Sequence, residues 1–376
     1  MKRLVLVGGG HAHLSVLEKL ARMSSHTPLQ GTEVILITPN RYQNYSGMLP
    51  GWISGHYTRE QSRVDLQPLL TASGVRIILA AVVAMSADDR TLTLSDGQQV
   101  TYDVLSLDVG SETQTEDLSA LGTRLLPVKP LDDFFDLWPV IEKRAIFQKD
   151  YALVVIGGGA AGVALAFAAQ YALQRSGAPG HVTLVVSPDG MLKGHHPSVR
   201  RRVLAYMRQA GIVLCQQAAT GVADGLQFSD GHRLYADQVI AATGAKPLAW
   251  LRQSGLSLNQ QGYILVDACH RTQSHPEVFA VGDTCARTDI QMARSGVHAV
   301  KAGPVLADNL YALLSDSSAR LKAYQPRKNS LYLLACGPRY AIASWGRFSF
   351  EGRWVWWLKD WIDRGFIKRF SHIKNQ

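Results

Sequence analysis

The sequence predicts an α/β protein with two nucleotide-binding βαβ units and an unrelated C-terminal segment. An apolar run that ends in three glycines occurs twice, at residues 4–10 and 153–159. Each copy continues to an apolar strand that runs into a glycine, at 104–110 and 239–244. A strand, a glycine-rich turn, a helix and a second strand form a unit that binds nucleotides. The composition then changes at residues 326–376, which hold five of the eight tryptophans.

The composition is that of a folded protein. The chain has 376 residues, which suggests two or three domains, and its 47% hydrophobic and 18% charged residues exclude disorder, collagen and coiled coil. Its four cysteines form no CxxC pair, so we expect no metal site and a reducing compartment. The first apolar run is too short for a signal peptide, and no apolar stretch is long enough to span a membrane. We therefore expect a cytoplasmic protein.

The second glycine-rich turn is a complete GxGxxG motif formed by Gly157, Gly159 and Gly162, with Ala160 and Ala161 between them. The first glycine permits a tight turn, and the second lets the backbone approach a pyrophosphate. The third allows the helix to pack closely on the strand, so that its N-terminal amides can hold phosphates. The motif and its strand–turn–helix context predict a dinucleotide site.

The first turn departs from this motif. It reads Gly8-Gly9-Gly10-His11-Ala12-His13, so a histidine occupies the third glycine position. We expect His13 to push the helix slightly outward, and a packing role for it is at least as well supported as a catalytic one.

The acidic residue that usually binds a ribose hydroxyl is missing from both copies. Thr38-Pro39-Asn40 ends the second strand of the first copy, and Ser187-Pro188-Asp189 ends that of the second. Ser187, Lys193 and the arginines at 200–202 could receive a 2′-phosphate, which would favour NADPH, or the arginines could form a solvated helix face. The choice between NADH and NADPH stays open.

Over residues 1–325 the chain resembles the pyridine nucleotide-disulfide oxidoreductases, flavoproteins with two Rossmann-like domains. The likeness rests on the two turns, Tyr102-Asp103, Ala242-Thr243-Gly244 and Gly282-Asp283. It implies FAD as cofactor in the first copy and NAD(P)H as substrate in the second. The domains it implies are an FAD-binding domain at 1–120 and 245–325, an NAD(P)-binding domain at 121–244, and a C-terminal docking segment at 326–376.

The resemblance also implies which residues contact each nucleotide. Those for FAD are Gly8, Gly9, Gly10, His11, Ala12, His13, Pro39, Asn40, Arg41, Val82, Gly110, Gly282, Asp283, Gly296 and Val297. Those for NAD(P)H are Gly157, Gly159, Ala160, Ala161, Gly162, Ser187, Thr243 and Gly244. A helix expected from about Gly296 to Leu314 would aim its N-terminus at the flavin and stabilise an anionic reduced ring.

Two features narrow the branch. The chain lacks the CxxxxC pair of the disulfide reductases, and its loop at 45–51 resembles that of type II NADH:quinone and sulfide:quinone oxidoreductases. Together, the first turn, this loop and the segment at 357–364 make the chain most similar to the flavoproteins sometimes fused to selenophosphate synthetase. Val297 and Lys301 stand where the quinone reductases carry paired glutamines, which weakens the likeness at the quinone site.

The resemblance implies an FAD-dependent NAD(P)H oxidoreductase that passes electrons to an acceptor, in first place a quinone. His298, Lys301 and Cys285 are catalytic candidates by position alone. Two alternatives stay open. One is a sulfide- or selenide-type donor reaction that uses Cys285 and Cys336, and the other is a non-catalytic FAD-binding partner protein.

The last 51 residues carry ten Lys or Arg and three Asp or Glu. Within 354–370 aromatic residues recur at i, i+3 and i+4, and Lys359, Asp360, Asp363 and Arg364 lie between them. A helix with an aromatic face and a basic face suits the inner surface of an anionic membrane, contacted through residues 345–370. The alternative is packing on the flavin domain or in a homodimer. No nucleic-acid-binding module is recognised, so we expect no nucleic-acid partner.

Overall fold

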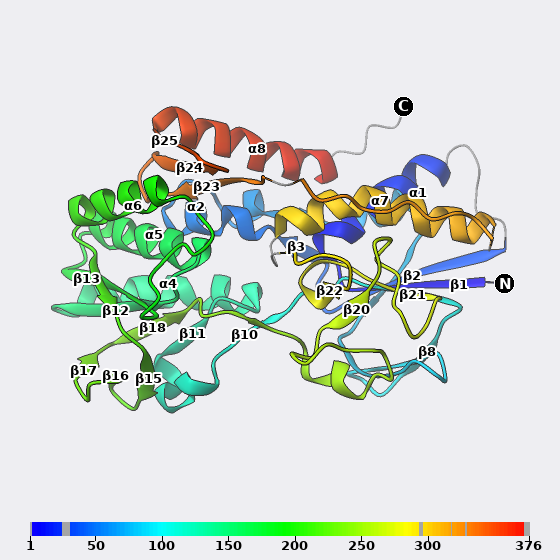
Figure 1. Cartoon of the computed structure of the whole chain (residues 1–376), viewed down its shortest axis with the longest axis horizontal. Helices are drawn as coiled ribbons and strands as arrows, with labels where there is room; N and C mark the ends of the chain where they lie inside the picture. The colour runs from blue at the N-terminus through cyan, green and yellow to red at the C-terminus, as the bar shows by residue number, and fades with distance from the viewer. Residues whose placement is uncertain (1, 25–30, 293–295, 317, 328, 372–376) are drawn as a thin grey trace.

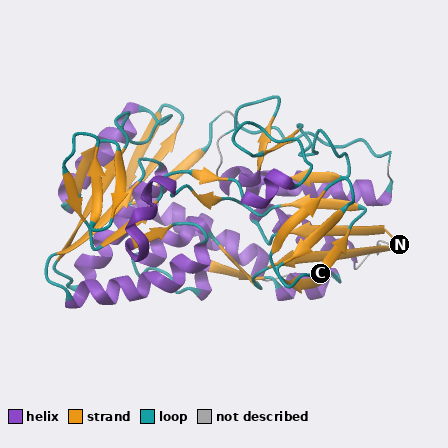
Figure 2. Ribbon diagram, turned by 90° about the horizontal axis from the view of Figure 1, so that it is seen from below, coloured by secondary structure: helices purple, strands orange, loops and turns teal. Residues whose placement is uncertain are grey.

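The structure is a computed structural model that describes residues 2–24, 31–292, 296–316, 318–327 and 329–371. Two five-stranded parallel sheets lie at opposite ends of the long axis, each with its own helices (Figure 1). Seen from below, the two sheets lie side by side in separate halves, with short strands between them (Figure 2). This confirms the predicted α/β class with two Rossmann-like units.

The first sheet has the order β21-β9-β1-β2-β5. Its strands are β1 (Lys2–Val7), β2 (Thr32–Thr38), β5 (Arg76–Leu79), β9 (Val104–Leu107) and β21 (Val278–Ala280). Because β21 pairs with β9, the chain returns to this sheet after building the second one. Alternate residues of β1 pack into cores on opposite faces of the sheet: Leu4 and Leu6 into one, Val5 and Val7 into the other. Both faces are therefore covered, as parallel sheets require.

Helices cover one face of this sheet and a small antiparallel sheet covers the other. The helices are α1 (His11–Ser24), α3 (Gln67–Ser73) and α7 (Gly296–Ser315), and the predicted helix from Gly296 matches α7. The antiparallel strands are β6 (Val82–Ser86), β7 (Thr91–Leu94) and β8 (Gln99–Thr101). Two further pairs flank them: β3 (Tyr42–Asn44) with β4 (Arg63–Asp65), and β20 (Ile264–Val266) with β22 (Cys285–Arg287).

The second sheet has the order β11-β18-β12-β13-β14. Its strands are β11 (Leu125–Pro127), β12 (Tyr151–Ile156), β13 (Gly180–Val186), β14 (Val213–Gln216) and β18 (Gln238–Ala241). Helices α4 (Leu131–Phe147), α5 (Ala160–Ser176) and α6 (Pro197–Ala210) pack with it in one core, joined by α2 (Leu49–Ile53). The strands β15 (Ala219–Val222), β16 (Gly225–Phe228) and β17 (Arg233–Tyr235) form an antiparallel sheet, part of which packs on the other face.

The two halves are joined by an antiparallel pair of crossing strands, β10 (Glu112–Thr113) and β19 (Ala245–Lys246). The predicted domain boundaries near 120 and 244 lie close to these strands, and the boundaries themselves stay a prediction. Short 3-10 helices complete the connections, at Ser46–Met48, Glu60–Ser62, Glu116–Arg124, Ala249–Gln253 and Gly282–Thr284.

The predicted strands at 104–110 and 239–244 end earlier than expected. β9 stops at Leu107 and β18 at Ala241. After β9 the chain leaves the sheet, and residues 108–110 line a cavity instead. The glycine at the end of the apolar run therefore marks a functional turn rather than the last residue of a strand.

The C-terminal segment folds into three strands and a helix along one edge of the molecule (Figure 1). The strands are β23 (Leu331–Ala335), β24 (Ala341–Trp345) and β25 (Phe348–Gly352), which the sequence analysis did not predict, and the helix is α8 (Arg353–Ser371). The end of the predicted segment, residues 372–376, lies outside the described residues. Among the described helices, none is both long and apolar enough to cross a bilayer.

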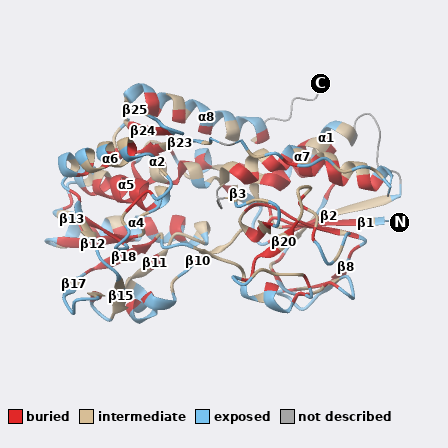
Figure 3. Ribbon diagram, viewed as in Figure 1, coloured by how far each residue is buried: buried red, intermediate tan, exposed pale blue. Residues whose placement is uncertain are grey.

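The predicted division of α8 into an aromatic and a charged face needs correction. Trp354, Trp357 and Trp361 are exposed, whereas Lys359 and Asp363 are buried. Figure 3 shows that α8 carries both exposed and buried residues. One face of α8 packs against the rest of the protein, and this buried face includes the ion pair between Lys359 and Asp363. The exposed side of α8 therefore carries three tryptophans beside basic residues, and the buried side holds Trp356 and Phe370 as well as the ion pair.

Candidate functional site

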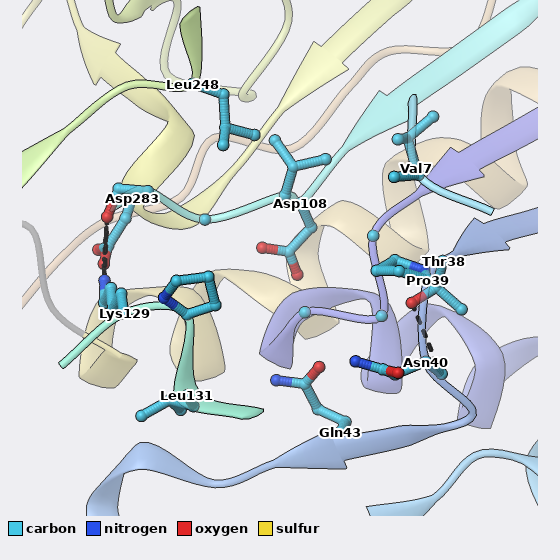
Figure 4. Close-up of a pocket in the computed structure, with 18 of the residues that line it drawn as sticks. Val7, Thr38, Pro39, Asn40, Gln43, Asp108, Lys129, Leu131, Leu248 and Asp283 are labelled. Carbon is cyan, nitrogen blue, oxygen red and sulfur yellow. Dashed lines mark hydrogen bonds and ion pairs between the residues drawn. The ribbon is translucent and has the colours of Figure 1, made fainter. Parts of the chain in front are cut away.

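A cavity of about 720 Å³ opens where β1, β2 and β9 end (Figure 4). Parallel sheets bind their ligands at the carboxyl ends of the strands, and this volume lies in the range of cofactor pockets. Most of the residues predicted to hold FAD line it. They are Gly8, Gly9, Gly10, His11, Pro39, Asn40, Val82, Gly110, Asp283 and Gly296. The structure thus brings together residues from six separate parts of the chain.

Five predicted FAD residues are not among the described residues that line the cavity. Arg41 pairs with Asp65 at 2.6 Å on the outside. The amides of Ala12 and His13 bond to the carboxyl group of Asp108. Gly282 and Val297 do not line the cavity themselves, but each is adjacent in sequence to a residue that does, Asp283 and Gly296 respectively.

The first turn needs glycine because β9 passes very close to it. A Cβ at Gly8, whose φ is +90°, would lie 2.4 Å from the carbonyl oxygen of Asp108. A Cβ at Gly10 would lie 2.3 Å from the Asp108 carboxyl group. These glycines therefore fit the turn around the end of β9, and the amides that follow them begin α1.

His13 is a packing residue, as one of its two predicted roles requires. Its ring is fully buried, with Nδ1 2.6 Å from the Gly8 carbonyl oxygen and Nε2 2.8 Å from Ser106 Oγ. Burial lowers the pKa of His13 to about 4, so the ring is neutral at pH 7. It fills the space between α1 and β9 that a glycine would leave open.

Polar groups without partners mark the cavity as the place of a large polar ligand. Nε2 of His11, Oδ1 of Asn44 and Oδ1 of Asp283 are buried and have no hydrogen-bond partner among the described residues, and all three residues line the cavity. Buried polar atoms are rarely left unpaired in folded proteins. The cavity therefore fits FAD, whose ribityl, phosphate and ring groups can supply such partners.

One end of the cavity carries a half-buried ion pair. Lys129 Nζ lies 2.6 Å from Asp283 Oδ2 and donates to Ser111 Oγ at 2.9 Å (Figure 4). Gly296 and Ala299, from the first turn of α7, line the same cavity. The helix N-terminus therefore faces the cavity, as the sequence analysis predicted, and favours negative charge there.

The C-terminal helix reaches the wall of this cavity. Phe366 of α8 stacks on Tyr45 at 4.3 Å between ring centroids, and both rings contact His11. Lys359 Nζ donates to the Gly47 carbonyl oxygen at 2.7 Å and lies 2.5 Å from Asp363 Oδ2. The loop at 45–51, on which the resemblance partly rested, is therefore held between the cavity and α8.

The three catalytic candidates do not reach the cavity, since none is among its described lining residues. His298 is buried and its Nδ1 lies 3.2 Å from Tyr324 Oη, on a side of α7 turned away from Ala299. Cys285 is buried 3.9 Å from His270 Nδ1, and Lys301 is half-buried. Their positions in the sequence suggested proximity to the flavin, but the phase of α7 and the direction of β22 turn them elsewhere.

The structure does not bring together Cys285 and Cys336, the two cysteines of the alternative donor reaction. Both cysteines are buried, and they belong to different hydrophobic cores, one beside each sheet. Burial raises the pKa of the Cys336 thiol, which opposes formation of a reactive thiolate. The structure therefore gives the sulfide-type reaction no cysteine pair.

The second glycine-rich turn has the geometry that a dinucleotide turn needs. A Cβ at Gly157 would lie 2.2 Å from the Ala242 carbonyl oxygen, and one at Gly162 would lie 2.0 Å from the Gly157 carbonyl oxygen. A Cβ at Gly159 would meet nothing within 4 Å, so this position is open on the side where a phosphate would approach. Ala160 and Ala161 follow it as the first residues of α5.

The remaining predicted NAD(P)H residues stand around this turn. Ser187 is exposed directly after β13, and Thr243 Oγ1 donates to the carbonyl oxygen of Gln114. Gly244 accepts a hydrogen bond from the backbone amide of Gln114 at 3.0 Å. Thr243 and Gly244 therefore tie the end of the second unit to the crossing strands.

The arginine run offers less to a 2′-phosphate than its charge suggested. Arg202 pairs with Glu351 and donates to Ser349 of β25, and Lys193 pairs with Asp189 at 2.5 Å. Arg201 is exposed on α6. Arg201 therefore fits the solvated helix face, whereas Arg202 packs against the C-terminal sheet and Lys193 is already paired with a carboxylate.

We expect Gly159→Ala to impair nucleotide binding without affecting the fold. The φ of Gly159 is −76°, so alanine fits the backbone, but its methyl group would occupy the open side of the turn. The Michaelis constant for NAD(P)H should rise at least about tenfold, the size of roughly 1.4 kcal/mol of lost contact. The measurement is steady-state kinetics together with a thermal melt, and an unchanged Michaelis constant would contradict the proposed site.

The sequence analysis missed several polar residues of the cavity. Lys129, Asn44 and Asp132 line it, and Asp132 accepts hydrogen bonds from Asn40 and Asn44 at 2.6 and 2.7 Å. Asp108 also lines it. One signal was available for Asp108, because it is an acid directly after a strand in which three of the four residues are apolar. The others come from loops that only the tertiary fold brings to this edge.

Comparison with known proteins agrees with this architecture. The profile of the pyridine nucleotide-disulphide oxidoreductase family matches residues 2–303. The chain is 27% identical over 306 residues to an NADH dehydrogenase-like protein of Mycobacterium tuberculosis, covering 76% of this chain and 73% of that protein. It is 24% identical over 363 residues to a demethylphylloquinone reductase of Synechocystis, covering 91% and 86%.

Solved structures share the fold over nearly the whole chain. NDH2 of Plasmodium falciparum in complex with NADH superposes with a TM-score of 0.81 at 13% identity, over 98% of this chain and 97% of that one. The sulfide:quinone oxidoreductase of Aquifex aeolicus superposes with a TM-score of 0.79 at 15% identity, over 99% and 92%. The chain therefore belongs to the pyridine nucleotide-disulphide oxidoreductase family, and it is an FAD-dependent NAD(P)H dehydrogenase, as its sequence predicts.

Proposed function

We propose that this protein transfers electrons from NAD(P)H to a quinone that approaches from the side of α8, with the exposed face of α8 against a membrane. The observation that carries the proposal is the position of α8. Its buried face contacts the loop at 45–51 beside the cofactor cavity, and its opposite face exposes three tryptophans. One element thus connects the cavity with a surface suited to a lipid interface.

The donor half of the reaction would use the two glycine-rich turns. Gly159 leaves room for the pyrophosphate of NAD(P)H, and the amides at the start of α5 would hold it. Bound FAD supplies the two-electron redox centre. Lys129, Asp283 and the N-terminus of α7 would orient it and favour the negative charge that reduction brings. Hydride transfer requires orientation and exclusion of water more than a protein acid or base.

The acceptor half would use the aromatic wall formed by His11, Tyr45 and Phe366. These rings pack against one another between the cavity and α8, so they exclude water from this side. Burial lowers the pKa of His11, a residue of the cavity lining, and its Nε2 has no hydrogen-bond partner among the described residues. A flat, apolar acceptor with polar oxygens, which is the chemistry of a quinone, suits such a wall. The similarity to a demethylphylloquinone reductase supports the same acceptor.

The membrane side of the proposal rests on the aromatic patch, by which we mean Trp345, Phe348, Phe350, Trp354, Trp357 and Trp361. All six are exposed, and the ring of Phe350 contacts that of Trp354, which joins the β24–β25 hairpin to α8. Exposed basic residues, among them Arg347, Arg353 and Arg364, accompany the patch. Aromatic and basic side chains together favour an anionic lipid surface.

The test is an anaerobic titration of the purified flavoprotein with NADH and with NADPH, followed by steady-state turnover. We expect either nucleotide to bleach the flavin absorption, and a soluble quinone to sustain many turnovers. A flavin reduced by nucleotide but not reoxidised by any quinone would contradict the acceptor. A flavin that responds to sulfide or selenide and to neither nucleotide would instead support the alternative donor reaction.

A further inference from the structure

The two glycine-rich turns of this chain differ at one pair of facing positions. In the second turn, a Cβ on Gly162 would lie 3.5 Å from the Cβ of Ala242, the residue that follows β18. In the first turn these positions hold His13 and Asp108. The backbones correspond, since the Asp108 amide donates to the last residue of β1 as the Ala242 amide donates to the last residue of β12. The first turn therefore carries an acid where the second carries a methyl group.

Asp108 occupies part of the site where a helix usually holds phosphate. Its Oδ2 accepts the amides of Ala12 at 2.8 Å and of His13 at 3.1 Å, and the residue is only 5% exposed. The free amides at a helix start are usually capped by a side chain just before the helix. Here the cap is Asp108, which is 96 residues from Ala12 in the sequence. Two of the amides at the start of α1 are thus bound to a protein carboxyl group beside the cavity.

The surroundings of Asp108 leave its charge only partly compensated. Burial raises the pKa of Asp108 to about 6, and Asp283 adds to the rise, while the two amide hydrogen bonds and His11 oppose it. Lys129 is paired with Asp283, and the ring of His13 is turned to Gly8 and Ser106. At pH 7 the Asp108 carboxyl group of the cofactor-free protein is therefore mostly ionised. Figure 4 shows it projecting into the middle of the cavity.

We propose that Asp108 couples FAD binding to the uptake of one proton, because the pyrophosphate of FAD would be held at the start of α1 beside this carboxyl group. The inference rests on the proposed placement of the pyrophosphate at the first glycine-rich turn. Two like charges in one buried site cannot both stay ionised without a large cost, so the carboxyl group takes a proton from water as the phosphates bind. The protonated group can then donate to a phosphate oxygen. No covalent bond changes.

The coupling has a definite sign. Binding of the anion raises the proton affinity of Asp108, so the complex holds one proton more than the free protein above about pH 6. The dissociation constant of FAD should therefore rise by up to about tenfold for each pH unit above that value. Below it Asp108 is already protonated and the affinity should level off.

The experiment is a titration of FAD into cofactor-free protein between pH 5.5 and 8.5, with the native chain and with Asp108→Asn. Asparagine keeps the shape and an acceptor oxygen for the α1 amides but carries no charge. We expect the dissociation constant of the native chain to rise by at least about tenfold across this range, and that of Asp108→Asn to change little and to be lower at pH 8. Equal pH dependence of the two proteins would overturn the inference.

Three controls locate the effect. Asp96→Asn, at an exposed residue outside the cavity, should keep the native pH dependence. ADP-ribose, which carries a diphosphate diester as FAD does but has no flavin, should show the same dependence as FAD, and riboflavin, which has no phosphate, should show none. A dependence that appears with riboflavin would assign the titration to another group, such as His11, and would overturn the role of Asp108.

A second measurement needs no variant and applies even if Asp108→Asn fails to fold. Calorimetry of FAD binding at pH 7.5, in two buffers of different ionisation enthalpy, counts the protons taken up. We expect a value close to one, and a value near zero would overturn the inference. FAD binding without pH dependence would overturn the inference alone, whereas no FAD binding at any pH would overturn the proposed cofactor site as well.

Discussion

Lys359→Met should lower the free energy of unfolding by roughly 3 kcal/mol, because it leaves the carboxylate of Asp363 buried without its cation. The side chains of the pair are only 11% and 5% exposed, and Nζ lies 2.5 Å from Oδ2. Burial raises the pKa of Asp363 even with the lysine present, which shows how poorly the site is solvated. The variant also loses the hydrogen bond from Lys359 to Gly47. Urea unfolding followed by tryptophan fluorescence measures the change, since most tryptophans lie in this segment.

A second variant separates lost pairing from lost packing. In the double variant Lys359→Met/Asp363→Leu no buried charge remains, so we expect most of the lost stability to return. Lys368→Met, at an exposed lysine of the same helix, should change stability by less than about 0.5 kcal/mol. If Lys359→Met behaves like Lys368→Met, or if the double variant is the least stable of the three, the ion pair does not hold α8 in place.

The sequence predicts the two halves of the fold well because both depend on local patterns. An apolar strand followed directly by glycines specifies a βαβ turn, and β1 and β12 both obey it. The strands β23, β24 and β25 were missed, although Gly337-Pro338 and Gly346 are turn signals. Each of these strands is only five residues long, and the aromatic and basic composition of the segment hid their short apolar runs.

The cofactor site was predictable to the extent that it is formed by consecutive residues. Gly8, Gly9 and Gly10 line the cavity because one turn places them together. Lys129 comes from the loop before α4 and meets Asp283 only in the folded chain, so no local pattern announces it. For His298, closeness in sequence gave a wrong prediction. It is two residues from Gly296, which lines the cavity, but its ring faces Tyr324 instead.

Charge is a poor guide to the faces of a helix that also packs on its own protein. Lys359 and Asp363 have i,i+4 spacing, which fits a solvated pair, and the sequence analysis placed them among the exposed charges. In the structure they point toward the loop at 45–51, and the tryptophans on the other face are exposed. Apolar residues usually mark the buried face of a helix, but of the apolar residues of α8 only Val355, Trp356 and Phe370 are buried, and the other three tryptophans are exposed.

Replacing Trp354, Trp357 and Trp361 together by serine should abolish binding to anionic vesicles. These side chains are 52%, 57% and 73% exposed and lie on one face of α8 at i, i+3 and i+7. A half-exposed tryptophan that enters a lipid interface contributes on the order of 2 kcal/mol from the apolar area it buries. The three together should therefore weaken binding at least about a hundredfold. Vesicle sedimentation measures it, and turnover with a lipid-borne quinone should fall in parallel.

Helix α4 offers a matched control, because Leu137, Val140 and Phe147 are also exposed apolar residues on one helix. Changing these three to serine should leave vesicle binding intact, and both triple variants should keep native turnover with NAD(P)H and a soluble quinone, since neither set lines the cofactor cavity. Vesicle binding that survives the loss of the three tryptophans would contradict the membrane role of α8. A native chain that ignores vesicles but dissociates from dimer to monomer in the tryptophan variant would instead assign this face to a second subunit, and the quinone would then have to reach the aromatic wall from solution.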